Sequence, residues 1–227
     1  MSALPYHIRI IPTNDGSYTF QIPEWNETYH SVHGAFNESM HVFIKNGLET
    51  FYQHFHPSPV IVGEAGFGTG LNAFLTLKWA LQNRVPVAYE TYEKFPISKE
   101  IAEEYAEKTG FPDKDIFMQL HESEWNKPVI LNPYFTLHKR QKDFREIDRK
   151  NYWHVFYFDA FSPRVQPELW ELSVLKRIFE GLQPGGIFVT YSAKGSVRRN
   201  LVKAGFQVER LPGPPGKREM LRGIKPR

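Results

Sequence analysis

The chain has 227 residues, of which 41% are hydrophobic and 23% charged, with no cysteine and a formal net charge of +3. This composition is ordinary for a folded globular protein, and the length favours one domain. The lack of cysteine excludes disulfides and thiolate sites, and the chain shows neither a signal peptide nor an apolar run of ~18 residues, so we expect a soluble, cytoplasmic protein.

The first 58 residues predict a hairpin followed by a helical segment. Two short strands flank a turn at Asn14-Asp15-Gly16, which is typical of a β-hairpin. The following stretch has helical spacing of large apolar residues, namely Phe43, Leu48, Phe51 and Phe55. A Pro-Ser-Pro break at 57–59 ends it, so we expect residues 1–58 to form an extension to a core at 59–227.

From residue 60 onward, predicted strands and helices alternate. The strands fall at 60–62, 87–92, 134–141, 152–158, 187–192, 206–212 and 218–224, and the helices at 71–81, 97–108, 167–182 and 195–205, with a turn at Gly185-Gly186. Such alternation indicates an α/β fold with a mostly parallel sheet. The last two strands have no helix between them, which predicts an antiparallel hairpin at one edge.

The stretch "EAGFGTG" at 64–70 lies between a predicted strand and a predicted helix. Glycine tolerates positive φ and lets backbone approach a ligand, and a helix N-terminus offers free N–H groups. A Walker loop is excluded because Leu71-Asn72 follows Gly70, and a dinucleotide fingerprint needs a different glycine spacing. The pattern resembles the first motif of class I S-adenosylmethionine-dependent methyltransferases. A tight turn without a ligand is the alternative.

Two carboxylates near the end of the next strand, Glu90 and Glu93, are candidates for binding ribose. A carboxylate only accepts hydrogen bonds and ribose hydroxyls donate them, so the pairing is favourable. Glu93 is preferred because it stands where the strand stops. A solvated charge at the strand end is the alternative.

Asp159 ends a nearly continuous apolar run at 152–158, as expected of a buried parallel strand. Ligands of open α/β sheets bind at the carboxyl ends of the strands. A carboxylate there can hold a substrate amine and help to remove its proton, since the attacking amine must be neutral. The alternative role is capping of the following turn. The motif of many DNA amino-methyltransferases is absent, which disfavours a base exocyclic amine as the target.

Six blocks of the chain resemble, in order, the bacterial tRNA wobble-uridine methyltransferase family, called MnmD when free-standing and forming the N-terminal half of bifunctional MnmC. They lie at 29–48, 63–77, 92–96, 158–170, 182–206 and 212–221, and "GFGTGLN" with "FDAFSP" is the most specific pair. The resemblance implies a Rossmann-like class I fold, S-adenosylmethionine as cofactor, and methylation of the primary amine of 5-aminomethyl-(2-thio)uridine to 5-methylaminomethyl-(2-thio)uridine. The FAD-dependent oxidase half is not expected.

The resemblance also implies roles for individual residues. The implied cofactor residues are Glu64, Gly66, Gly68, Gly70, Asn72, Glu93 and the adjacent Lys94. Asp143 occupies the place of a family acidic residue that meets the adenine amino group, although the usual preceding glycine is Lys142 here. The implied substrate residues are Tyr29, Ser31, Glu38, Phe161, Lys217 and Arg218, with Asp159 as the catalytic residue. For Tyr29, Ser31 and Glu38, packing and capping are the alternative.

Three groups of basic residues are candidates for contact with tRNA phosphates, which dominate nucleic-acid affinity. They are Lys139, Arg140, Lys142 and Arg145; Arg198, Arg199 and Lys203; and Lys217 with Arg218. Ordinary solvated faces are the alternative. A wobble base in the anticodon loop could stack on an aromatic side chain, but the sequence selects none.

His30, His33 and His41 lie close together in sequence, but no carboxylate completes a ligand spacing, so no metal site is expected. We also expect a monomer. Two other functions stay open: a class I methyltransferase acting on a small-molecule amine, and a non-catalytic RNA-binding module that keeps the fold.

Overall fold

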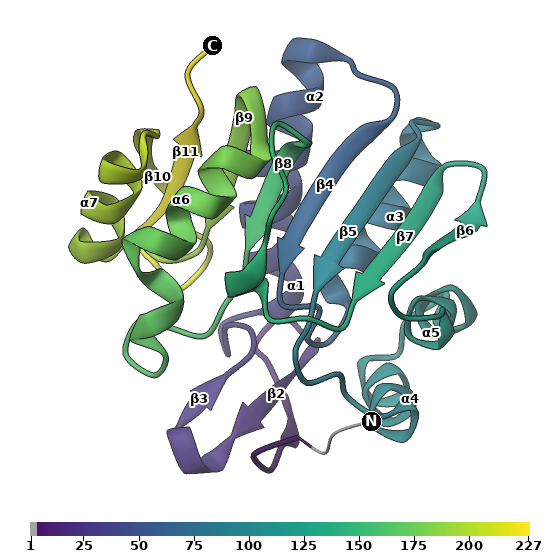
Figure 1. Cartoon of the computed structure of the whole chain (residues 1–227). Coiled ribbons are helices and arrows are strands. Elements are labelled where there is room, and N and C mark those ends of the chain that lie inside the picture. The colour runs from purple at the N-terminus through teal and green to yellow at the C-terminus, as the bar shows by residue number, and fades with distance from the viewer. Residues whose placement is uncertain (1–3) are drawn as a thin grey trace.

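The structure, a computed structural model, describes residues 4–227 and contains two sheets (Figure 1). The smaller is antiparallel and comprises β1 (Arg9–Pro12), β2 (Tyr18–Ile22) and β3 (Glu27–Thr28), with a short 3-10 turn η1 (Pro23–Trp25) before β3. The predicted hairpin is confirmed, because β1 and β2 pair directly. This small sheet lies beyond the carboxyl ends of the central strands of the larger sheet (Figure 1).

A single helical run follows the small sheet. It consists of α1 (Ala35–Ser39), η2 (Met40–Glu49), whose turns are of the π type, and α2 (Thr50–Phe55). The junction residues Ser39 and Thr50 keep right-handed helical dihedral angles, so the run is continuous. The predicted helical spacing is confirmed, with Phe43, Leu48 and Phe51 buried.

The larger sheet has eight strands in the order β10-β11-β9-β8-β4-β5-β7-β6. Their bounds are β4 (Val60–Ala65), β5 (Val87–Tyr92), β6 (Pro128–Asn132), β7 (Phe135–Arg140), β8 (Trp153–Phe158), β9 (Leu182–Thr190), β10 (Gln207–Pro212) and β11 (Glu219–Ile224). The five strands from β9 to β7 are parallel, while β10, β11 and β6 run antiparallel to their neighbours. The predicted mostly parallel α/β sheet with a C-terminal edge hairpin is confirmed.

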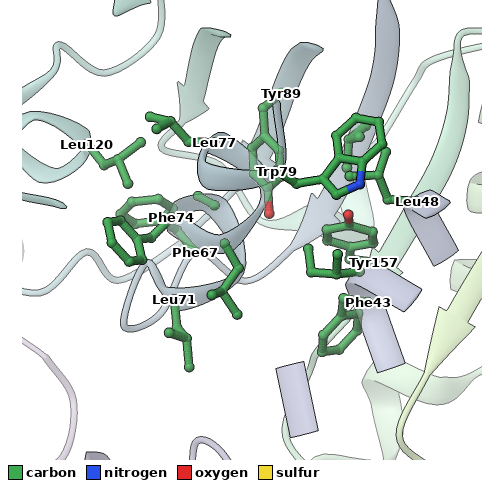
Figure 2. Close-up of a cluster of buried hydrophobic side chains, with 14 of the residues drawn as sticks. Phe43, Leu48, Phe67, Leu71, Phe74, Leu77, Trp79, Tyr89, Leu120 and Tyr157 are labelled. Atoms are coloured by element: carbon green, nitrogen blue, oxygen red, sulfur yellow. The ribbon is translucent and has the colours of Figure 1, made fainter. Parts of the chain in front are cut away.

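Helices cover both faces of this sheet, giving three layers. They are α3 (Leu71–Asn83), α4 (Lys99–Thr109), α5 (Lys114–Glu122), α6 (Leu172–Gly181) and α7 (Gly195–Ala204), with short 3-10 turns η3 (Phe144–Glu146) and η4 (Pro167–Trp170). One core joins η2, α3, α4 and α5 to one face, where Phe43, Phe74 and Tyr157 lie among its large side chains (Figure 2). A second core joins α6 and α7 to the other face.

Several boundaries differ from the expected ones. The amphipathic α5 and the short edge strand β6 were not predicted. The expected helix 167–182 is two elements, because Glu171 adopts extended backbone angles between η4 and α6. Gly185 and Gly186 lie inside β9 at a register shift against β8 instead of preceding the strand, and the positive φ of Gly185 (82°) fits a bulge.

The connection between α2 and β4 contains the expected division at residue 58. The helical run before it nevertheless packs into the same core as β4 and β8, which supports one domain; the division remains our proposal. In the part of the chain that the structure describes, no helix is long and apolar enough to cross a membrane.

Candidate active site

The strand order of the larger sheet reverses beside β4. Ala65, the last residue of β4, lies opposite Tyr92 of β5 and Phe158 of β8. The loops that follow these three strands therefore meet at the switch point, where open α/β sheets bind their ligands. A cleft lies there, lined by these loops together with residues of the small sheet and η4.

The glycine loop forms one wall of the cleft through Gly66 and Gly68. Their φ angles are 88° and 51°, and that of Gly70 is 78°, which L side chains rarely adopt. A Cβ at Gly68 would lie 3.2 Å from the Tyr29 ring, and one at Gly70 would lie 2.6 Å from His121 Nε2. Gly66 and Gly68 thus present bare backbone to a ligand, whereas Gly70 starts α3 and packs against His121 outside the cleft.

Glu93 faces the cleft directly after β5. Its carboxylate accepts hydrogen bonds from the N–H groups of Gly68 (3.1 Å) and Phe95 (2.8 Å). Burial raises its pKa, and these N–H groups oppose that rise. Because the glycine loop orients it, Glu93 is placed to accept hydrogen bonds from ribose hydroxyls.

Glu90, the other candidate, lies in the core instead. It accepts hydrogen bonds from Arg140 (2.6 Å) and Arg149 (2.7 Å), and from the indole N–H of Trp153 (3.1 Å). Burial works to raise its pKa, but the two guanidinium groups outweigh burial and lower it. The hydrogen-bonding capacity of this carboxylate is therefore taken up by partners within the protein.

Asp143 lines the far end of the cleft beside Lys94 and Phe144. It accepts hydrogen bonds from Arg145 Nη2 (2.6 Å) and Lys94 Nζ (3.3 Å). Partial burial works to raise its pKa, but the hydrogen bonds from Arg145 outweigh this and lower it to about 2. Asp143 is thus an ionised acceptor, and a ligand amino group there would share it with Arg145.

Asp159 follows β8 and lines the cleft next to the glycine loop, with its carbonyl oxygen 3.6 Å from the position that a Cβ at Gly66 would take. Its Oδ2 accepts a hydrogen bond from Asn72 Nδ2 at 2.8 Å. Burial, together with the charge of Glu38, raises its pKa to about 7, against the opposing hydrogen bond from Asn72. A carboxyl group in this range can take up a proton at neutral pH.

Glu64 lies beneath the glycine loop and does not line the cleft. Its side chain is buried in β4, and Oε2 has no hydrogen-bond partner among residues 4–227. Burial raises its pKa to about 8. Asn72 lines the cleft, whereas Glu64 does not. A cofactor role for Glu64 would therefore be indirect.

Aromatic side chains form the wall contributed by the N-terminal segment. Tyr29 and Phe161, both expected at the substrate site, line the cleft with ring centroids 5.0 Å apart. Tyr6 and Trp25 complete this wall, and the hydroxyls of Tyr6 and Tyr29 are 2.9 Å apart. Sequence reasoning missed Tyr6 and Trp25, since only the folding of the small sheet over the cleft brings them there.

Four of the expected substrate residues do not line this cleft: Ser31, Glu38, Lys217 and Arg218. Glu38 is buried and accepts hydrogen bonds from the Ser31 N–H (2.7 Å) and from Lys217 Nζ (2.5 Å). Lys217 Nζ also lies 3.9 Å from the centroid of the Tyr191 ring. Glu38 and Lys217 thus form an ion pair whose charges act on Asp159, while Arg218 is exposed.

The first basic group does not form one exposed face, because one member is buried and two are paired with carboxylates. Lys139 is fully buried, and its Nζ donates to the carbonyl of His121 at 2.6 Å. Arg140 is paired with Glu90, and Arg145 with Asp143. In contrast, Arg198, Arg199 and Lys203 are exposed on α7, and no carboxylate of residues 4–227 pairs with them.

Of the histidines at positions 30, 33 and 41, two contact other groups of the protein through Nε2. His30 Nε2 contacts Thr69 Oγ1, and His41 Nε2 contacts the carbonyl of Pro212. Among the described residues no group of three potential ligands could hold a metal ion.

Comparison with known proteins gives consistent results. A family model described as S-adenosyl-L-methionine-dependent methyltransferase matches residues 135–226. The MnmC proteins, named tRNA 5-methylaminomethyl-2-thiouridine biosynthesis bifunctional proteins, are similar over most of this chain. That of Leptospira borgpetersenii is 32% identical over 88% of this chain and 32% of its own length. That of Aeromonas salmonicida is 27% identical over 88% of this chain and 33% of its own length.

Solved structures extend the comparison. The crystal structure of MnmC2 from Aquifex aeolicus matches with a TM-score of 0.77 and 27% identity, over 98% of this chain and 73% of that one. Spermidine synthase from Thermotoga maritima shares the fold, with a TM-score of 0.62 and 16% identity over 99% of this chain and 70% of that one.

The fold, the glycine loop at the switch point and these matches define a class I S-adenosylmethionine-dependent methyltransferase. More particularly, the chain is homologous to the MnmC proteins over 88–94% of its length. It spans about a third of the length of these relatives.

Proposed function

We propose that this enzyme methylates the primary amine of 5-aminomethyl-(2-thio)uridine at the tRNA wobble position, giving 5-methylaminomethyl-(2-thio)uridine. The printed names of its MnmC relatives, which refer to 5-methylaminomethyl-2-thiouridine biosynthesis on tRNA, support this assignment. The reaction would take place in the cytoplasm, with the anticodon loop as partner, and would need neither a metal ion nor a second copy of the chain.

The observation that carries the proposal is the position of Asp159. It lines the cleft next to the glycine loop, is buried, and has a pKa raised to about 7 by that burial. When bound, S-adenosylmethionine supplies an electrophilic methyl group. An ammonium group has no lone pair, so the substrate amine must lose a proton before it can accept a methyl group, and Asp159 would take up that proton.

Other residues of the cleft hold the two substrates. Gly66 and Gly68 offer close backbone approach to the methionine portion of the cofactor, Glu93 accepts from its ribose, and Asp143 from its adenine amino group. The aromatic wall around Phe161 offers faces on which a splayed base can stack.

The proposal is tested by transfer of a radiolabelled methyl group to tRNA from cells that lack this methylation step. Free 5-aminomethyluridine and simple polyamines serve as competing acceptors, and fully modified tRNA as the control. We expect label in the unmethylated tRNA alone. Label in the free amines but not in tRNA would contradict the proposal.

A further inference from the structure

His30 lies between the glycine loop and Asp159, and the proposed mechanism has not used it. Its side chain is buried, and its backbone N–H donates to Thr19 Oγ1 at 2.9 Å, which fixes its position after β3. Nε2 lies 2.8 Å from Thr69 Oγ1, and Nδ1 lies 3.6 Å from Asp159 Oδ2. Nδ1 has no hydrogen-bond partner among residues 4–227.

The contacts of Thr69 allow its hydroxyl to donate to Nε2 of His30, which is the arrangement assigned here. Thr69 Oγ1 accepts a hydrogen bond from the N–H of Leu71 at 3.2 Å, so its own hydroxyl hydrogen is available to His30. When that hydroxyl donates to Nε2, the ring proton of a neutral imidazole resides on Nδ1. The Nδ1–H group then faces Asp159.

The imidazole is neutral at physiological pH. Burial lowers the pKa of His30 to about 4, with Lys217 acting in the same direction and Glu38 against it. The charged groups that act on Asp159 are the same Glu38 from α1 and Lys217 from the β10–β11 loop, and beneath it lies Glu64 of β4. Tyr191, which follows β9, faces it as a neutral phenol.

Both donors near Asp159 lie closest to the same carboxylate oxygen, Oδ2. Asn72 Nδ2 donates to Oδ2, and His30 Nδ1 lies closest to the same atom. This arrangement leaves Oδ1 for the substrate amine. The separation of 3.6 Å is longer than a hydrogen bond; catalytic hydrogen bonds are often long in the absence of substrate, and the role assigned to His30 requires this one to shorten when substrate binds.

We propose that His30 is a positioning residue for Asp159: its Nδ1–H, held toward Oδ2 by the Thr69 hydroxyl, keeps the carboxylate ionised and its Oδ1 aimed at the amine. The role in turnover rests on the proposed function, since it requires an amine substrate whose proton Asp159 accepts.

The first test compares His30→Phe, which retains a ring but no donor, with His30→Asn, whose amide N–H can replace Nδ1–H. A carboxylate that loses a donor becomes harder to ionise. We expect the acidic limb of the pH profile of kcat/KM to move up by about 1 pH unit in His30→Phe. At pH values on that limb, kcat/KM should then be roughly tenfold lower than in the wild type. His30→Asn should retain the wild-type limb. An equal fall at every pH would indicate a merely structural role and contradict the proposal.

The second test needs no tRNA, so its outcome is independent of the proposed function. Carbon-13 labelling of aspartate Cγ follows the titration of Asp159, identified by its loss in Asp159→Asn, and nitrogen-15 labelling of histidine reports the tautomer of His30. We expect an Nδ1–H tautomer in the wild type and in Thr69→Ser. Thr69→Val should lose it, and the Asp159 midpoint should rise in Thr69→Val and His30→Phe. An Nε2–H tautomer in the wild type, or an unchanged midpoint in both variants, would overturn the proposal.

Discussion

Asp159 carries the proposed chemistry because few groups of the protein form hydrogen bonds with its carboxylate. Its only side-chain hydrogen bond among residues 4–227 comes from Asn72, whereas Glu90 is held by two guanidinium groups. A carboxylate fixed by two arginines stays ionised, while one that is buried with few donors gains and loses a proton near neutral pH.

The substitution Asp159→Asn should therefore abolish most turnover. The amide keeps the size of the side chain but cannot accept a proton from the amine, so kcat should fall by ~10²–10⁴-fold. Calorimetry should find S-adenosylmethionine affinity within a few-fold of wild type, because Asp159 is placed toward the amine. Turnover near the wild-type rate at neutral pH would refute its role.

Lys139 gives a prediction about stability. Its side chain is fully buried, and burial lowers its pKa from 10.5 to about 7. Between these values the unfolded chain binds more protons than the folded one, so this group makes the free energy of unfolding rise with pH, by about 3 kcal/mol from pH 7 to pH 10. We expect Lys139→Met to remove this rise. If the free energy of unfolding rose equally with pH in the wild type and the variant from about pH 7 to pH 10, the expectation would be contradicted.

At this scale the sequence could predict residues at strand ends but not contacts made by folding. Glu93 and Asp159 follow apolar strands, and the order of the strands brings their loops together. His30 and Trp25 reach the cleft only because the small sheet lies over it, and no spacing in the sequence encodes that placement. Lys139 alternates in phase with the buried Phe135 and Leu137, and its Nζ donates to the carbonyl of His121 in α5, a contact that the local sequence does not reveal.

The glycine loop is the element that ties cofactor and fold together. Its Gly68 N–H holds Glu93, and its Gly68 Cα faces the Tyr29 ring, so one residue connects the β4–α3 turn to the small sheet.

A bulky residue at 68 should affect binding more than folding. In Gly68→Val the φ of 51° is strained, and the new Cβ lies 3.2 Å from the Tyr29 ring, at the cleft wall. We expect S-adenosylmethionine affinity to fall at least tenfold in calorimetry, with the far-ultraviolet circular dichroism unchanged. The matched change Gly110→Val, at a helix end with open space around it, should leave affinity intact. Normal binding by Gly68→Val would rule out this role for the loop.

Helix α7 carries exposed cations that no carboxylate of residues 4–227 pairs with. It begins shortly after β9, whose carboxyl end lies beside that of β8, and Asn200 of α7 donates to the carbonyl of Trp170 in η4. The double change Arg198→Ala/Arg199→Ala should weaken tRNA binding for all acceptor tRNAs and reduce the slope of log K against log salt by up to about 2.

The control for this measurement is Lys108→Ala on α4, which lies on the other side of the molecule from α7 (Figure 1). It should leave both affinity and salt slope unchanged. Equal effects from the two sets of changes would place the phosphate track elsewhere.

Elements with strong periodicity could be predicted, and short ones could not. The parallel strands and α3 follow directly from apolar runs and the glycine turn. The edge strand β6 is largely exposed, with Ile130 77% exposed, and its pairing with β7 is set by a partner that the local sequence does not reveal.

At the scale of the whole molecule, the site is assembled from both ends of the chain. Glu38 and Lys217 are 179 residues apart in sequence and form a partly buried ion pair beside Asp159. The small sheet lies beyond the carboxyl ends of the core strands (Figure 1), and Trp25 and Tyr29, which flank β3, line the cleft. The resemblance implied residues from both ends of the chain at one site, and the structure brings Tyr29 and Phe161 together at the cleft while Glu38 and Lys217 pair outside its lining.

The central claim is that this enzyme adds one methyl group to the amine of a modified wobble uridine in tRNA. Nucleoside mass spectrometry of unmethylated tRNA, incubated with the protein and S-adenosylmethionine, tests it most directly. The account predicts that 5-aminomethyl-(2-thio)uridine is converted to its methylamino form at the wobble position, with no other nucleoside changed, and that Asp159→Asn leaves the tRNA unaltered. Methylation at any other nucleoside, or none under conditions where the protein binds the cofactor, would contradict it.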